Sequence, residues 1–149
     1  MDAVQNLVVN VIHLQSNTGG TMSGNRFESS QARALIKYVD AQYGRDLEFL
    51  WPRTPDNAVW RRGDNGKWFG ALLTVKKNKV IHGADETPIE ILDVRCAPDM
   101  IDIVVDKKMI FPGWHMNKKH WITIVLDGRM DIAQIYSLLD NSYALALKK

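Results

Sequence analysis

Two stretches of the chain carry apolar residues at the spacing of an amphipathic helix. In the first, Ser29 or Ser30 can cap the opening turn, and Gly44 follows the last turn, where a left-handed residue is needed. The second is predicted to start at Asp131, with Gln134 at the position that a capping box requires. The predicted buried stripes are Ala32, Leu35, Ile36, Val39 and Tyr43 in the first helix, and Ile132, Ile135, Tyr136, Leu139 and Tyr143 in the second.

Between these helices, apolar and polar residues alternate as they do in strands. Residues 58–62 and 67–75 flank the turn Gly63-Asp64-Asn65-Gly66, and an Asn-Gly pair is a strong hairpin signal. The second arm of this hairpin is predicted to turn one face to the core. The residues on that face are Phe69, Ala71, Leu73 and Val75.

Two more strands follow, over residues 89–96 and 121–126, and Pro98 suits the first position of a short helix that runs to about residue 106. The last strand places three apolar residues on one face, namely Ile122, Ile124 and Leu126. The order of helix, hairpin, strand, short helix, strand and helix predicts an α+β domain. We expect a twisted, mostly antiparallel sheet with helices packed on one face.

Residues 1–28 are predicted to form an extension to a single domain that covers residues 29–149. Apolar residues recur at helical spacing over 3–15, and a linker rich in Gly, Ser, Thr and Asn follows over 16–25. Three roles stay open for this extension. It packs on the domain, it pairs with another chain to make a homodimer, or it is a start-site artefact with Met22 as the true start.

Composition excludes several classes of protein. Hydrophobic residues make up 46% of the 149 residues and charged residues 24%, which is typical of a globular domain with a core. No apolar run approaches the roughly 20 residues of a membrane helix, and polar residues interrupt the arrangement of a signal peptide. Cys96, the single cysteine, lies in an apolar strand, which predicts a buried, reduced thiol. We therefore expect a cytoplasmic protein that does not associate with membranes.

The net charge of +2 conceals an uneven distribution along the chain. Residues 51–79 carry a local charge of +5, residues 80–106 carry −6, and residues 107–149 carry +4. Such blocks favour a basic face and an acidic face on the folded domain. The alternative, that folding scatters these charges around the surface, stays open.

A cationic loop with two histidines leads directly into the last strand. Because a rigid strand holds it, this loop is the best candidate for a functional surface. Binding to nucleic acid needs cations spaced to meet phosphates, and few residues here suit the reading of base edges, so the sequence predicts weak, salt-sensitive, non-specific DNA binding. The candidate residues are His115, Asn117, Lys118, Lys119 and His120 in the loop, and Arg61, Arg62 and Lys67 beside the hairpin turn.

Other kinds of site fit the sequence less well. His115 and His120 lack a neighbouring cluster of cysteines or carboxylates, whereas zinc needs three or four converging ligands, so no metal or cofactor is predicted. There is no nucleophile elbow, phosphate-binding loop or zinc-hydrolase motif, and we predict no enzymatic activity. In one alternative, Asn117 and His120 tie the loop down through backbone hydrogen bonds. In another, Trp114 and Trp121 line a pocket or stack on a ligand in a non-catalytic module that binds a small molecule or a protein.

The same loop resembles a known family. The run His115-Met116-Asn117-Lys118-Lys119-His120-Trp121, followed by Leu126-Asp127-Gly128 and by Ile135-Tyr136 in the last helix, is similar to the MmcQ/YjbR family of small bacterial proteins, which are often labelled DNA-binding. The similarity covers roughly residues 30–147 and leaves out the extension. It implies a CyaY-like α+β fold and double-stranded DNA as a partner, and it carries over no catalytic residue.

Overall fold

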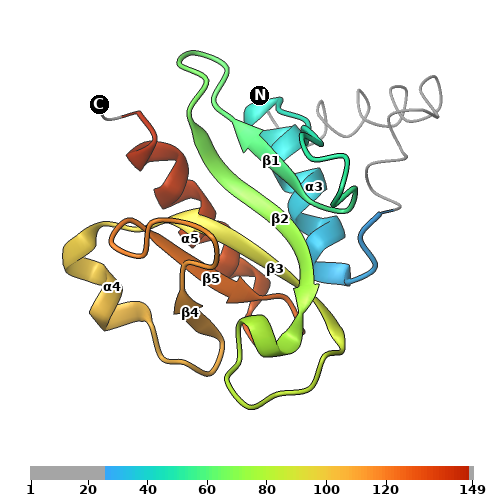
Figure 1. The fold of residues 1–149 in the computed structure, drawn as a ribbon. Coiled ribbons are helices and arrows are strands. Elements are labelled where there is room, and N and C mark those ends of the chain that lie inside the picture. Colours follow the sequence, from blue (N-terminus) through green and yellow to red (C-terminus); the bar gives the residue numbers. More distant parts are fainter. Residues whose placement is uncertain (1–25, 148–149) are drawn as a thin grey trace.

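The computed structural model describes residues 26–147, which form a five-stranded antiparallel sheet in the order β1-β2-β3-β5-β4 (Figure 1). This confirms the predicted α+β fold. The elements are α3 (Ser30–Tyr43), β1 (Ala58–Arg61), β2 (Trp68–Lys76), the 3₁₀ helix η1 (Lys77–Lys79), β3 (Pro88–Arg95), α4 (Pro98–Val104), β4 (Ile110–Pro112), β5 (Trp121–Val125) and α5 (Ile132–Leu145).

The first long helix begins and ends where the sequence predicts, and the second begins where predicted. The Ser29 hydroxyl accepts a hydrogen bond from the backbone N–H of Ala32 at 3.0 Å, and Gly44 adopts a left-handed φ of 64° after the last turn of α3. Asp131 precedes α5, but its side chain makes no capping hydrogen bond, so the predicted capping box with Gln134 is not formed. Packing on the sheet, rather than a capped first turn, therefore holds α5 in place.

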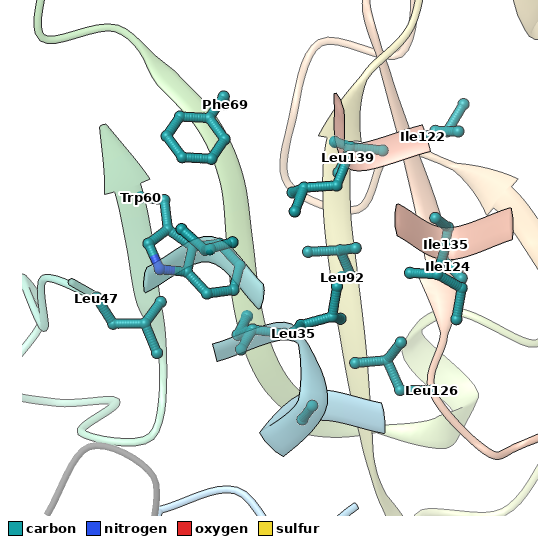
Figure 2. Close-up of a cluster of buried hydrophobic side chains, with 14 of the residues drawn as sticks. Leu35, Leu47, Trp60, Phe69, Leu92, Ile122, Ile124, Leu126, Ile135 and Leu139 are labelled. Carbon is teal, nitrogen blue, oxygen red and sulfur yellow. The ribbon is translucent and has the colours of Figure 1, made fainter. Parts of the chain in front are cut away.

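The main core lies between the sheet and the helices α3 and α5. Leu35 of α3 and Leu139 of α5 are fully buried and lie over Leu92 at the centre of the sheet (Figure 2). The predicted inward face of β5 is confirmed, since Ile122, Ile124 and Leu126 all belong to this core. Helices thus cover one face of the sheet, as expected.

A β-bulge corrects one prediction about β2. Trp60 pairs with Gly70 and Arg61 pairs with Trp68, so Phe69 is an extra residue in the ladder. Phe69 turns to the helix side, together with Trp60. The other three residues of its predicted face lie on the opposite side of the sheet, and they are Ala71, Leu73 and Val75.

Loops, rather than helices, cover this second face of the sheet, which we call the loop face. Its buried apolar side chains include Ile91 and Phe111, and half-buried residues of three loops pack against them. The residues that these loops contribute are Trp51, Val80, Ile81, Trp114 and Met116. The sheet is therefore buried on both sides. One of the covering loops, which contributes Trp114 and Met116, also carries the candidate residues of segment 115–120.

Four further features differ from the sequence prediction or lie outside the described residues. The strand β4 falls in a segment that was predicted as loop, and α4 ends at Val104 rather than near residue 106. The predicted helix over 3–15 and its linker lie outside the described residues. Phe27, assigned to the extension, is fully buried and stacks on Phe49, so the packed unit includes it. Within the described part of the chain, no helix is long and apolar enough to cross a membrane.

Candidate functional site

Antiparallel pairing brings the two candidate loops to the same end of the sheet. Arg61 pairs with Trp68, Arg95 pairs with Trp121, and the Nε of Arg95 donates to the carbonyl oxygen of Trp68 at 2.6 Å. The hairpin turn at 62–67 and the loop between β4 and β5 both extend from this end. The structure thus places together two groups of cations that lie about fifty residues apart in the sequence.

Arginine and tryptophan alternate across four strands at this end, and we call these four residues the Arg–Trp row: Arg61, Trp68, Arg95 and Trp121. The guanidinium carbon of Arg61 lies 5.8 Å from the centroid of the Trp68 ring, and that of Arg95 lies 4.8 Å from the Trp121 ring. Both distances fit cation–π contacts. Trp51 packs edge-on against Trp68, with ring centroids 5.8 Å apart. The row therefore forms an ordered platform of flat groups.

The loop that joins β4 to β5, residues 113–120, is held in shape by its own backbone. The Asn117 side chain accepts from the N–H of Lys119 at 2.9 Å, and the Asn117 carbonyl accepts from the N–H of His120 at 3.0 Å. The His120 carbonyl in turn accepts from the N–H of Cys96 at 2.9 Å. This agrees with the interpretation that Asn117 and His120 tie the loop down. The imidazole of His120 stays exposed.

Gly113 allows loop 113–120 to start in close contact with β5. A Cβ at this position would lie 2.8 Å from the Cβ of Trp121 and 2.9 Å from its carbonyl oxygen. Because the second of these contacts is with backbone, Gly113→Ala is expected to lower the free energy of unfolding by about 1–3 kcal/mol. In Gly63→Ala the new methyl group would meet only the flexible side chain of Arg45. Denaturant unfolding of both variants checks this, and equal stabilities would contradict it.

Beneath the loop lies a buried carboxyl that the sequence analysis did not single out. Asp93 and Thr123 are fully buried on the loop face of β3 and β5. The Thr123 hydroxyl donates to Oδ1 of Asp93 at 2.5 Å and accepts from the backbone N–H of Trp114 at 2.8 Å. Among residues 26–147, no group makes a hydrogen bond to Oδ2 of Asp93. A chain of hydrogen bonds therefore connects loop 113–120 to the loop face of the sheet.

Burial raises the pKa of Asp93 to about 8, although the hydrogen bond from Thr123 and the charge of Lys118 act to lower it. The Lys118 ammonium donates to the carbonyl oxygen of Gly113 at 3.0 Å. At neutral pH the carboxyl of Asp93 is therefore mostly protonated. The carboxyl of Asp93 therefore contributes little negative charge beneath the loop.

The cations of loop 113–120 that the sequence predicted are on the surface. The side chains of His115, Lys118, Lys119 and His120 are exposed. The last three, with Pro98, Ile101 and Asp102 of α4, line an open groove of about 310 Å³. His115 has a positive φ of 58° and rests edge-on against Trp114, with ring centroids 4.0 Å apart. Trp114 and Trp121 do not line the groove, and Trp121 is only 7% exposed.

Arg62 lies inside the protein rather than on the surface that a phosphate contact requires. Its Nε and Nη2 donate to Asp64 at 2.9 and 2.7 Å, and Nη1 donates to the carbonyl oxygen of Tyr143 at 2.8 Å. The guanidinium also lies 4.0 Å above the Tyr143 ring, and the hydrogen bonds to Asp64 raise its pKa. Its role is therefore to fasten the hairpin turn to α5.

The other two hairpin candidates differ from each other. Arg61 is 35% exposed, and its Nε pairs with Glu48 at 3.1 Å. Lys67 is half-buried beside the turn. Of the two, Arg61 has the defined geometry, because it lies in the Arg–Trp row. Within residues 26–147, no group of three or more His, Cys, Asp or Glu side chains is placed to hold a metal ion.

The fold and this end of the sheet define a class of small α+β domains with a single antiparallel sheet, helices on one face and a cationic loop over the other. The chain belongs to the YjbR family, whose model matches residues 41–145. This confirms the family that the motif around loop 113–120 indicated.

Relatives and solved structures agree with this assignment. The uncharacterised protein YyaQ of Bacillus subtilis is 35% identical over 112 residues, which cover 74% of this chain and 93% of that protein. The uncharacterised protein YjbR of Escherichia coli is 33% identical over 57 residues, which cover 38% of this chain and 48% of that protein. A crystal structure of a Pseudomonas syringae protein matches with a TM-score of 0.73 at 31% identity, over 76% of this chain and 97% of that one.

Proposed function

We propose that this protein is a non-catalytic DNA-binding protein that contacts phosphates through loop 113–120 at the end of the sheet. The observation that carries the proposal is the exposure of His115, Lys118, Lys119 and His120 on a loop held rigidly by β4 and β5. Lysines on a fixed loop meet phosphates without reading sequence. Affinity is therefore expected to be weak, non-specific and dependent on salt.

The charges around the loop support an anion as the ligand. The groove beside it has two lysines and a histidine in its lining against one carboxylate, Asp102. Asp93, under the loop, holds its proton at neutral pH because burial raises its pKa to about 8. A small-molecule site between Trp114 and Trp121 has less support, because Trp121 is buried and neither ring lines this groove.

The test is fluorescence anisotropy of labelled duplex DNA, titrated with protein between about 50 and 200 mM salt. Affinity is expected to fall steeply with salt. In the variant Lys118→Ala/Lys119→Ala it is expected to fall by about tenfold at low salt, and the slope of log affinity against log salt should decrease by about two, since two phosphate contacts are lost.

The matched control is Lys76→Ala/Lys79→Ala, which removes the same two charges at the opposite end of β2. This variant is expected to bind within about twofold of the wild type, because Lys76 lies eight residue steps, or about 27 Å, along β2 from the end of the sheet that bears the loop. Equal losses in the two variants would mean a general charge effect and would refute the loop as the site. Absence of binding at low salt would refute DNA binding altogether.

A further inference from the structure

The Arg–Trp row lies on the same side of the sheet as loop 113–120, where Arg61, Trp68 and Arg95 are partly exposed. Trp121 is buried, with the guanidinium of Arg95 over its ring. Trp51 and Trp68 pack in the apolar cluster of the loop face, as do Trp114 and Met116 of the loop. The row runs across the strands in the order β1, β2, β3 and β5, one residue from each. Neighbouring strands are about 4.8 Å apart, so the three partly exposed members, on β1, β2 and β3, span about 10 Å. A platform of this length accommodates two or three stacked bases.

The groups of this platform suit bases rather than phosphates alone. Aromatic rings and guanidinium planes stack on the faces of unpaired bases, whatever their sequence. In Arg95, Nε is fixed by the carbonyl oxygen of Trp68 and the guanidinium lies over Trp121, so the plane of the group is held in position. Arg61 is held similarly between Glu48 and Trp68. A duplex hides the faces of its bases, whereas a single strand exposes them.

We propose that Trp51 and the partly exposed members of the Arg–Trp row, Arg61, Trp68 and Arg95, form a stacking platform for unpaired bases. The preferred ligand of this protein is then single-stranded rather than duplex DNA. This inference rests on the proposed phosphate contacts of loop 113–120, which either form of DNA can make. In a complex with a single strand, Lys119 and its neighbours would hold phosphates, and Trp51, Trp68 and the two arginines would hold bases.

The experiment compares a labelled single strand with the duplex of the same sequence, at one salt concentration and with the same protein. Wild-type protein is expected to bind the single strand about tenfold more tightly. Stacking should also quench the tryptophan fluorescence of the protein, and the duplex should quench it less.

Two variants separate stacking from charge. Trp51→Leu removes a half-buried loop ring without altering the sheet. It is expected to weaken single-strand binding by about tenfold while leaving duplex binding unchanged. Arg61→Lys/Arg95→Lys keeps both charges but removes the planar groups, so it should reduce the preference for the single strand without changing the salt dependence. Trp51→Leu keeps the test valid if the double variant fails to fold.

The outcomes distinguish this inference from the function on which it rests. If duplex and single strand bind equally, or the duplex binds more tightly, the platform is refuted while DNA binding by the loop stands. If the single strand is preferred but neither variant changes that preference, the row is not its cause and the inference is refuted. If wild-type protein binds neither form, both proposals fail.

Discussion

The contribution of Asp93 to the free energy of unfolding is expected to fall as the pH rises from about 4 to about 8, because burial raises the pKa of its carboxyl to about 8 in the folded protein. In the unfolded chain an aspartate has a pKa of about 3.9. Between these values the folded state keeps the proton and the unfolded state releases it. The protonated carboxyl therefore makes its full contribution to the free energy of unfolding below the unfolded pKa. Above that pKa the contribution decreases by about 1 kcal/mol per pH unit, and the decrease stops above the folded pKa.

Asp93→Asn isolates this contribution, because the amide does not titrate. The measurement is the difference in unfolding free energy between wild type and variant at several pH values, since the contributions of other groups cancel in the difference. The free energy of unfolding of the variant, relative to that of the wild type, is expected to increase steadily as the pH rises toward 8. Asp102→Asn, which removes an exposed carboxyl of α4, is the matched control for the loss of one carboxyl. A curve for Asp93→Asn that runs parallel to that of the wild type would show that Asp93 does not hold its proton.

Thr123→Val is expected to lower the free energy of unfolding by about 2–4 kcal/mol at neutral pH. Valine has the shape of threonine but neither donates to Oδ1 of Asp93 nor accepts from the N–H of Trp114. Each polar group left without a partner in a buried site costs about 1–3 kcal/mol. The substitution therefore breaks the connection between loop 113–120 and the sheet while filling the same volume.

Thr123→Ser is the matched control, because serine keeps the hydroxyl and loses only a methyl group. Denaturant unfolding should rank the wild type first, serine second and valine last. Hydrogen exchange at the Trp114 amide should be faster in the valine variant than in the serine variant, since only valine removes its acceptor. Valine as stable as serine would contradict a structural role for these hydrogen bonds.

Local signals predicted most of the fold. The cap at Ser29, the turn at Gly44 and the periodicity of α5 depend on neighbours within one or two turns, and such features can be read along the chain. The bulge at Phe69 could not be predicted in this way, because it depends on the register between β1 and β2. The short strand β4 was missed since only its pairing with β5 defines it.

Residues of the candidate site also fall into two groups: those that local sequence predicts, and those that depend on distant contacts. The exposure of Lys119 follows from a polar loop before an apolar strand, but the burial of Arg62 depends on Tyr143, eighty-one residues away. The Arg–Trp row joins residues from four strands, and no spacing along the chain indicates it. One signal was present for Asp93: in β3, polar Asp93 alternates with apolar Leu92 and Val94. That alternation could have placed the carboxyl on the face opposite the helices.

The thiol of Cys96 allows opening of the protein at this end of the sheet to be measured without an introduced label site. It is the single thiol of the chain, it is buried, and the backbone N–H of Cys96 is bonded to the carbonyl oxygen of His120. Its side chain belongs to the core between the sheet and the helices, so a thiol-reactive dye can label it only when this end of that core opens. The rate of labelling of the unmodified protein therefore counts how often this end of the sheet opens. A DNA strand bound across the end should slow that rate.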